Sequence, residues 1–282
     1  MKAQVTLTVA EGKALIAAAI ASRPEVKSAL ANGKILLKGG TTVAAVARQL
    51  IASELRISGR ISPRGTKAAK YISAQPHSIL IDKGIVRNID DCFAEAVASL
   101  RPADVAVIGA NALDSSGQTA IMLGRPLGGM VGQGLAGLTA QGCKIMIACG
   151  LEKLIPGSIA VAVKAAGIYS TQWAMGMAVG LAPLYGEVVT EQQALASLAD
   201  VTCTVIGSGG IHGAEGGVTM VVDGEDTAVA QAFQHVFEIK GSLATGCAAS
   251  YDECAAGSSG CAVHQGCLWR IAKGEKMEWP VK

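Results

Sequence analysis

The sequence contains few aromatic residues and few charged ones. Aromatic side chains make up 4% of the 282 residues and charged side chains 16%, whereas 50% are hydrophobic and 35 residues are glycine. A core with so few aromatics must be built from closely packed Ala, Val, Ile and Leu, and the chain is long enough for one large or two ordinary domains. The net charge of +2, and the lack of aromatics among the basic residues, argue against a nucleic-acid-binding protein.

A targeting signal and a membrane span are not expected either. An apolar stretch follows Lys2, but Glu11 and Lys13 interrupt it, and Thr8–Glu11 has the capping-box pattern of a helix start. Residues 165–186 carry no charge and reach the length of a bilayer span, yet glycine, proline and polar residues interrupt them. We expect an N-terminal helix, buried or interface-forming segments at 165–186, and a cytoplasmic protein with no membrane partner.

Compact C-x2-C pairs are missing as well. Without a secretory signal, the eight cysteines indicate a reducing compartment and no disulfides. Four of them, with the spacing C-x6-C-x6-C-x5-C, are Cys247, Cys254, Cys261 and Cys267. One hypothesis is a zinc ion or iron–sulfur cluster held by these thiolates, with His264 as an additional ligand. The alternative is a run of small residues in which cysteine packs like alanine.

One junction has the pattern of an anion site. Residues 33–50 predict a strand, a glycine turn and a helix that begins near Thr41. Free backbone N–H groups and the positive end of the helix dipole meet at such a turn, and glycines let a ligand approach the main chain closely. Gly39, Gly40, Thr41 and Thr42 are therefore predicted to bind a phosphate or carboxylate.

The following segment is basic. Between residues 56 and 70 there are five cationic side chains and no acidic one: Arg56, Arg60, Arg64, Lys67 and Lys70. In a chain of low net charge this cluster favours anion binding, and residues 59–67 are predicted to form a basic loop. A solvated surface loop without specific function is the alternative.

Short apolar runs alternate with helical patterns, which is typical of a parallel sheet covered by helices. The predicted strands are 35–38, 78–82, 105–109 and 144–149, and the predicted helices are 8–22, 24–32, 41–53, 90–100 and 131–141. The predicted fold class is α/β, with a Rossmann-like, mostly parallel sheet and helices on both faces. Ligands of such sheets lie beyond the carboxyl ends of the strands, where the turn after Lys38 is expected.

After residue 186 the pattern changes to strand 187–189, helix 191–198, strands 201–207 and 217–222, and helix 225–239. A last strand at 241–246 would complete the βαββαβ order of a ferredoxin-like α+β domain. We expect an anion-binding domain at 1–185, this smaller domain at 186–246, and a cysteine-rich tail at 247–282. No helix follows the glycine-rich stretch 207–217, which favours a loop over a dinucleotide fingerprint. Its His212 and Glu215 are either acid–base groups or exposed structural residues.

Three stretches together resemble the superfamily of ribose-5-phosphate isomerase, sugar-phosphate-sensing repressor domains and CoA transferases. Residues 39–43 resemble its phosphate-binding turn, residues 104–114 with Gly117 resemble its Gly-Ala-Asp-x-x-Asp strand end, and residues 145–154 resemble its final strand with a following lysine. The resemblance covers about residues 29–156. It implies an anionic, phosphorylated ligand, and the small lid domain of many members suits the second domain predicted above.

The chain also departs from that pattern. Asn111 stands where the first aspartate of the motif belongs, and an amide cannot act as a carboxylate base. Residues 115–151 contain no acidic side chain, although the isomerases carry a proton-abstracting Glu in the corresponding stretch. The remaining catalytic candidates are Asp114, Lys153 and, as the nucleophile of a transferase, Glu215. Arg125 either clamps an anionic group or lies on the surface.

Two functions remain open at this point. One is an isomerase-like or transferase-like enzyme that acts on a phosphorylated sugar, a nucleotide-like compound or a CoA ester. The other is a non-catalytic sensor or structural subunit that binds such a ligand. In either case we expect the protein to form a homo-oligomer. Missing carboxylates favour the second function. The predicted ligand-binding residues are Gly39, Gly40, Thr41, Thr42, Arg60, Arg64, Lys67, Asn111 and Arg125.

Overall fold

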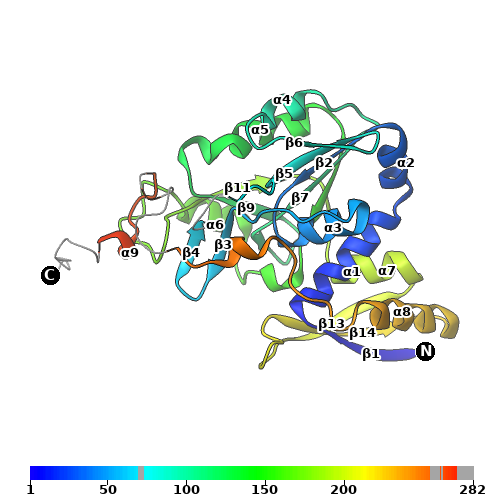
Figure 1. The fold of residues 1–282 in the computed structure, drawn as a ribbon. Coiled ribbons are helices and arrows are strands. Elements are labelled where there is room, and N and C mark those ends of the chain that lie inside the picture. Colours follow the sequence, from blue (N-terminus) through cyan, green and yellow to red (C-terminus); the bar gives the residue numbers. More distant parts are fainter. Residues whose placement is uncertain (69–72, 255–260, 262, 272–282) are drawn as a thin grey trace.

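A six-stranded sheet forms the centre of the molecule (Figure 1). The computed structural model describes residues 1–68, 73–254, 261 and 263–271. The strands lie in the order β12 (Glu187–Val189), β10 (Lys144–Ala148), β7 (Val105–Gly109), β2 (Lys34–Lys38), β5 (Ser78–Asp82) and β6 (Ile85–Asn88). β12, β10, β7 and β2 pair in parallel, whereas β5 and β6 pair antiparallel. The fold is therefore α/β with a mixed sheet.

Within the six-stranded sheet, antiparallel pairing is confined to β5 and β6, where the sequence predicted a strand at 78–82 but no direction. Lys83 and Gly84 turn the chain from β5 into β6, with φ of 48° and 81°. Two successive residues with positive φ define the hairpin turn that matches the twist of two antiparallel strands. Parallel neighbours would need a long crossover instead, for which residues 83–84 leave no room.

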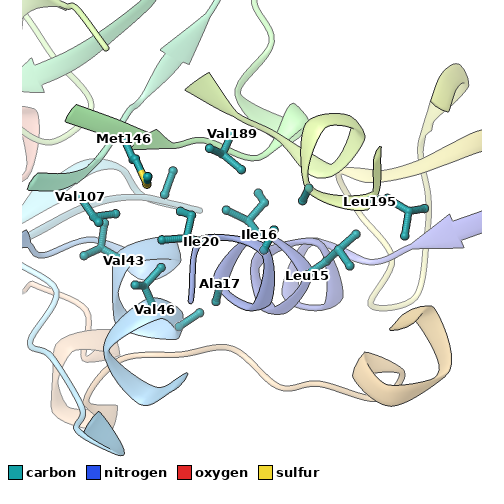
Figure 2. Packing of buried hydrophobic residues seen from close by; sticks show 14 of the residues in the cluster. Leu15, Ile16, Ala17, Ile20, Val43, Val46, Val107, Met146, Val189 and Leu195 are labelled. Atoms are coloured by element: carbon teal, nitrogen blue, oxygen red, sulfur yellow. The ribbon is translucent and has the colours of Figure 1, made fainter. Parts of the chain in front are cut away.

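Helices cover both faces of this sheet. One face packs against α1 (Val9–Ser22), α3 (Thr41–Ile51) and α7 (Glu191–Ala199), and the other against α4 (Phe93–Ala98) and α5 (Gly129–Ala140). Because side chains alternate along a strand, Ile35 and Leu37 of β2 enter the first core and Leu36 enters the second. Figure 2 shows the first core, in which Ile20 of α1 and Val43 of α3 lie near Val107 of β7.

Local signals define where the helices begin. The Thr8 hydroxyl accepts a hydrogen bond from the Glu11 N–H at 3.3 Å, and the Glu11 carboxylate accepts one from the Thr8 N–H at 2.8 Å. This reciprocal pair confirms the predicted capping box, because it satisfies donors that a helix start leaves open. Proline occupies the first turn of α2 (Pro24–Asn32), where its missing N–H costs nothing.

A second sheet corrects the prediction for residues 186–246. It has the order β1 (Lys2–Leu7), β14 (Gly217–Asp223) and β13 (Thr202–Gly209), all antiparallel, and α8 (Asp226–Ile239) packs on it. Residues 241–246 form a turn and loop instead of the expected strand, and β12 joins the six-stranded sheet. β1, which the sequence did not predict, pairs with β14 over six residues. One apolar core runs from this sheet through α1 to the central sheet.

Smaller elements complete the described chain. They are the sheet of β8 (Ala112–Leu113), β9 (Thr119–Leu123) and β11 (Gly180–Leu184), the hairpin of β3 (Gly59–Ser62) and β4 (Gly65–Ala68), and the short helices η1 (Pro126–Gly128), η2 (Leu151–Lys153), α6 (Ile159–Ala165), η3 (Ala248–Tyr251) and α9 (Leu268–Ile271). The predicted basic loop is thus a β-hairpin. Among the described residues, no helix has the length and apolar character needed to cross a membrane.

Candidate functional site

A cavity of about 860 Å³ lies beyond the carboxyl ends of β2, β7 and β10. Residues 39–42, residues 109–111 and Lys153, at or after the ends of these three strands, line it. The β3 strand, residues 121–125 and parts of the C-terminal segment, including Tyr251 and His264, line it as well. Its position and size are those of a small-molecule site in an open α/β sheet.

The glycine turn opens directly into this cavity. Gly40 is the N-cap of α3 in an extended conformation, and no side chain in the described part of the chain caps the first N–H groups of the helix. A Cβ on Gly40 would have no atom within 4 Å, so this side of the turn is open. A Cβ on Gly39 would overlap the carbonyl oxygen of His77, so glycine is required there by packing. The turn therefore presents N–H groups and the positive end of a helix dipole to the cavity.

Lys38 and His77 lie beside the turn, and sequence reasoning missed both. Burial lowers the pKa of Lys38 to about 8. Burial, and then the charge of Lys38, lower the pKa of His77 to about 3, so this imidazole is neutral at pH 7. Its Nδ1 lies 2.9 Å from the Arg56 carbonyl. The side chain of Lys38 forms no ion pair or hydrogen bond with any described residue. The one signal in the sequence was a lysine that ends an apolar strand directly before two glycines.

A buried charge cluster borders the cavity at the end of β10. The Glu152 carboxylate binds the amino groups of Lys13 at 3.4 Å and Lys153 at 3.1 Å, and these three side chains are 13%, 12% and 22% exposed. Glu191 lies next to them and accepts a hydrogen bond from the Leu151 N–H at 2.9 Å. Burial raises the pKa of Glu191 to about 7, and the charge of Glu152 adds to this effect.

Glu191→Gln is expected to stabilise the protein in a pH-dependent way. The folded state binds a proton at Glu191 more readily than the unfolded state, so its contribution to stability is full below pH 4.5 and is lost as pH rises through about 7. Glutamine keeps an acceptor for the Leu151 N–H without the charge. Urea unfolding should show a gain of about 1–3 kcal/mol at pH 8 and little gain at pH 4. An equal gain at both pH values would contradict the buried-charge explanation.

Eight predicted site residues line the same cavity: Gly39, Gly40, Thr41, Thr42, Arg60, Asn111, Arg125 and Lys153. Thr42 is 3% exposed and belongs to the packing of α3 as well as to the cavity wall. The side-chain oxygen Oδ1 of Asn111 accepts a hydrogen bond from the Met122 N–H at 2.9 Å, which fixes the orientation of the Asn111 side-chain amide. Arg125 forms no ion pair or hydrogen bond through its side chain with any residue that the structure describes.

The predicted basic cluster holds the C-terminal segment. Arg60 donates to the carbonyl of Asp252 at 2.6 Å, and Lys67 donates to the carbonyl of Cys254 at 2.8 Å. Arg64 stacks on the ring of Trp269 at 4.3 Å, and its carbonyl accepts the indole N–H at 2.8 Å. Arg64 and Lys67 do not line the cavity. Lys70 lies outside the described residues.

Asp114 has a structural environment outside the cavity. It is 4% exposed, and its carboxylate accepts the N–H of Ile159 at 2.9 Å, the hydroxyl of Ser116 at 2.6 Å and the N–H of Gln118 at 3.0 Å. These bonds lower the pKa of Asp114 to about 2, with the Ile159 N–H as the largest cause. The carboxylate thereby joins the β8–β9 turn to the start of α6.

Asp114→Asn is therefore expected to lower the Tm while leaving anion affinity unchanged. The amide offers one acceptor oxygen where the carboxylate uses two, so a backbone N–H of the turn or of α6 loses its partner. Thermal unfolding and calorimetric phosphate titration of the same preparation test both statements. Loss of phosphate binding at an unchanged Tm would instead assign Asp114 to the ligand site.

Glu215 and the four tail cysteines do not line the cavity, although His264 does. Glu215 is exposed between β13 and β14, where its carboxylate accepts the Gly213 N–H at 2.9 Å. Of the four tail cysteines, Cys254 is buried and the others are partly exposed, and none lines the cavity. Within the ranges that the structure describes, no three His, Cys, Asp or Glu side chains are arranged to hold a metal ion.

The fold and the cavity together define an α/β protein with a cavity at the carboxyl edge of its sheet, in which cationic lining side chains outnumber acidic ones. No family model, curated protein or solved structure matches the chain.

Proposed function

We propose that this protein binds a phosphorylated or otherwise anionic small molecule, such as a sugar phosphate, a nucleotide-like compound or a CoA ester, at the turn of Gly39–Thr42. The observation that carries the proposal is the open N-terminus of α3, which faces a cavity of ligand size beside the Lys38 amino group, for which the described residues provide no partner. N–H groups, a helix dipole and an ammonium group that converge on one space stabilise negative charge there.

The likeness to the ribose-5-phosphate isomerase superfamily is part of this proposal. Lys38 pairs with Ile108, and Ala148 pairs with Gly109. The ends of β2, β7 and β10 therefore lie side by side, and each of the three stretches that carry the resemblance contains or directly follows one of these strand ends. This arrangement supports a Rossmann-like description of residues 1–185. An isomerase-like or transferase-like reaction at the turn would then require an acid–base group from another part of the cavity.

The alternative is a non-catalytic ligand sensor or subunit, which specific contacts favour. Asp90, the carboxylate nearest to His77, binds Arg56 at 2.8 Å and accepts the N–H groups of His77 and Ser78. His77 is neutral at pH 7 and its Nδ1 is engaged by a carbonyl. Neither group is placed to abstract a proton from a ligand at the turn. Asp91 and Glu253 remain as carboxylates of the wall.

A ligand panel tests the proposed function and separates its two forms. The probes are inorganic phosphate, ribose 5-phosphate, AMP and acetyl-CoA, each followed by thermal shift. A probe at 100 times its Kd stabilises the folded state by about 2.7 kcal/mol, which corresponds to a Tm increase of about 5–10 °C in a chain of this size. Absence of any shift at millimolar concentration overturns the proposal. NMR of the incubated probe distinguishes turnover from binding alone.

A further inference from the structure

Several cationic side chains line the cavity, and two groups of them, the first and second cationic places, lie near the ends of β2 and β10. The first is the Gly39–Thr42 turn with Lys38, at the end of β2. The second is the pair Lys13 and Lys153, which come from α1 and from the short helix after β10 and also line the cavity. The first place takes one anionic group. The second has no role in the binding proposed above.

The charges of the second place do not cancel. A single carboxylate, Glu152, lies between the two ammonium groups, at 3.4 Å from Lys13 and 3.1 Å from Lys153. One of its oxygens, Oε2, is buried without a hydrogen-bond partner among the described atoms. Glu191, the next carboxylate, is 2% exposed, and burial raises its pKa to about 7, so that at neutral pH it cancels only part of a positive charge. Near and below pH 7, an excess of positive charge therefore remains at this largely buried wall, and an anion from the cavity can neutralise it.

Sheet geometry sets the separation of the strand ends near which the two places lie. β2, β7 and β10 are consecutive neighbours, and Lys38, Ile108 and Ile147 lie at the same level of the sheet. Two strand spacings place the ends of β2 and β10 about 10 Å apart. The end of β7 between them is formed by Gly109, Ala110 and Asn111, which line the cavity with small side chains. A sugar-sized molecule lying across β7 reaches both places.

We propose that Lys13 and Lys153 form a second anion subsite, so that the ligand carries two anionic groups, one at the Gly39–Thr42 turn and one at this lysine pair. The inference rests on the proposed function of the turn and adds the ligand class, a doubly anionic compound of sugar size. Its second group is a phosphate or a carboxylate, since both satisfy an ammonium pair.

Calorimetric titration with three hexose derivatives tests the second subsite. Fructose 6-phosphate has one anionic group, fructose 1,6-bisphosphate has two phosphates, and 6-phosphogluconate has a phosphate and a carboxylate. At least one doubly anionic probe is expected to bind about tenfold more tightly than fructose 6-phosphate. In Lys153→Met this advantage should fall below about threefold, while affinity for fructose 6-phosphate stays the same. Lys13→Met should reduce the advantage of the doubly anionic probe in the same way. If Lys13→Met does not fold, Lys153→Met still provides the test, because Lys153 is more exposed.

Lys144→Met is the matched control. Lys144 begins β10, at the end of the strand away from Lys153, and it binds Glu187 at 2.6 Å. The control removes the same charge and should keep the full advantage of the doubly anionic probe. Equal affinity for all three hexoses, or an advantage that survives in Lys153→Met, overturns the second subsite and leaves the proposed function standing. If neither inorganic phosphate nor any hexose binds, both proposals are wrong.

Discussion

Gly40→Asp is expected to abolish phosphate binding and to raise the Tm at the same time. The extended backbone at residue 40 accepts any side chain, and a Cβ there points into open space. An aspartate at this N-cap accepts the free N–H groups of α3 and complements its dipole, which adds about 0.5–1.5 kcal/mol of stability. The same carboxylate occupies the donors that the ligand needs and repels its charge. About 4 Å from a bound phosphate, that repulsion lowers affinity by at least about 100-fold.

Gly40→Ala is the control for this substitution. Alanine adds a methyl group at the same place, but it supplies neither a cap nor a charge. Phosphate affinity, measured by calorimetry, should remain within about threefold of the wild type. A Gly40→Asp protein that binds phosphate as well as Gly40→Ala does would show that the ligand lies elsewhere in the cavity, and it would remove the basis of the proposed function.

Lys38→Met is expected to stabilise the protein and to weaken anion binding. Burial of an unpaired ammonium costs free energy, which the lowered pKa of Lys38 reflects, and methionine keeps most of the volume without the charge. At pH 7 the gain in free energy of unfolding should be about 1–3 kcal/mol. Phosphate affinity should fall by at least about tenfold, because one of the two sources of positive charge at the turn is gone.

The stabilisation by Lys38→Met depends on pH with a definite sign. Between the folded pKa of about 8 and the ordinary value of 10.5, the unfolded state binds more protons than the folded state, so the wild type gains stability as pH rises. The advantage of the variant is full below pH 8 and disappears near pH 10.5. Lys34→Met, on the same strand but at the end where Lys34 donates to the Ser99 carbonyl, is the matched control and should lose stability. A Lys38→Met protein less stable than wild type at pH 7 would contradict the assignment.

Most elements of the fold were predictable because their signals are local. The capping box at Thr8, the proline that opens α2 and the apolar strands β2, β7 and β10 are set by neighbouring residues, and they form with bounds within a few residues of the predicted ones. β1 was missed because its partner, β14, follows more than 200 residues later. The expected strand at 241–246 failed because β1, from the other end of the chain, completes the second sheet.

The candidate site was predictable at the turn and unpredictable around it. Glycines before a helix start predict an anion site from local sequence alone, and residues 39–42 line the cavity, whereas the anion remains a prediction. Arg60 holds the C-terminal segment by donating a hydrogen bond to the carbonyl of Asp252, and no local sequence pattern indicates this partner. Lys38 and His77 acquire their lowered pKa values from burial, which depends on what packs around them.

The sequence alone determined the alternation of strands and helices and the turn of residues 39–42, because periodicity, capping and glycine act over a few residues. Tertiary structure alone decided which charged side chains interact with other groups of the protein and which remain for a ligand. Arg64 and Lys67 are engaged with Trp269 and Cys254, whereas Lys38 keeps its charge beside the turn. The physical reason is that the effect of a charge depends on its distance to every other charge and on the water around it, and folding sets both.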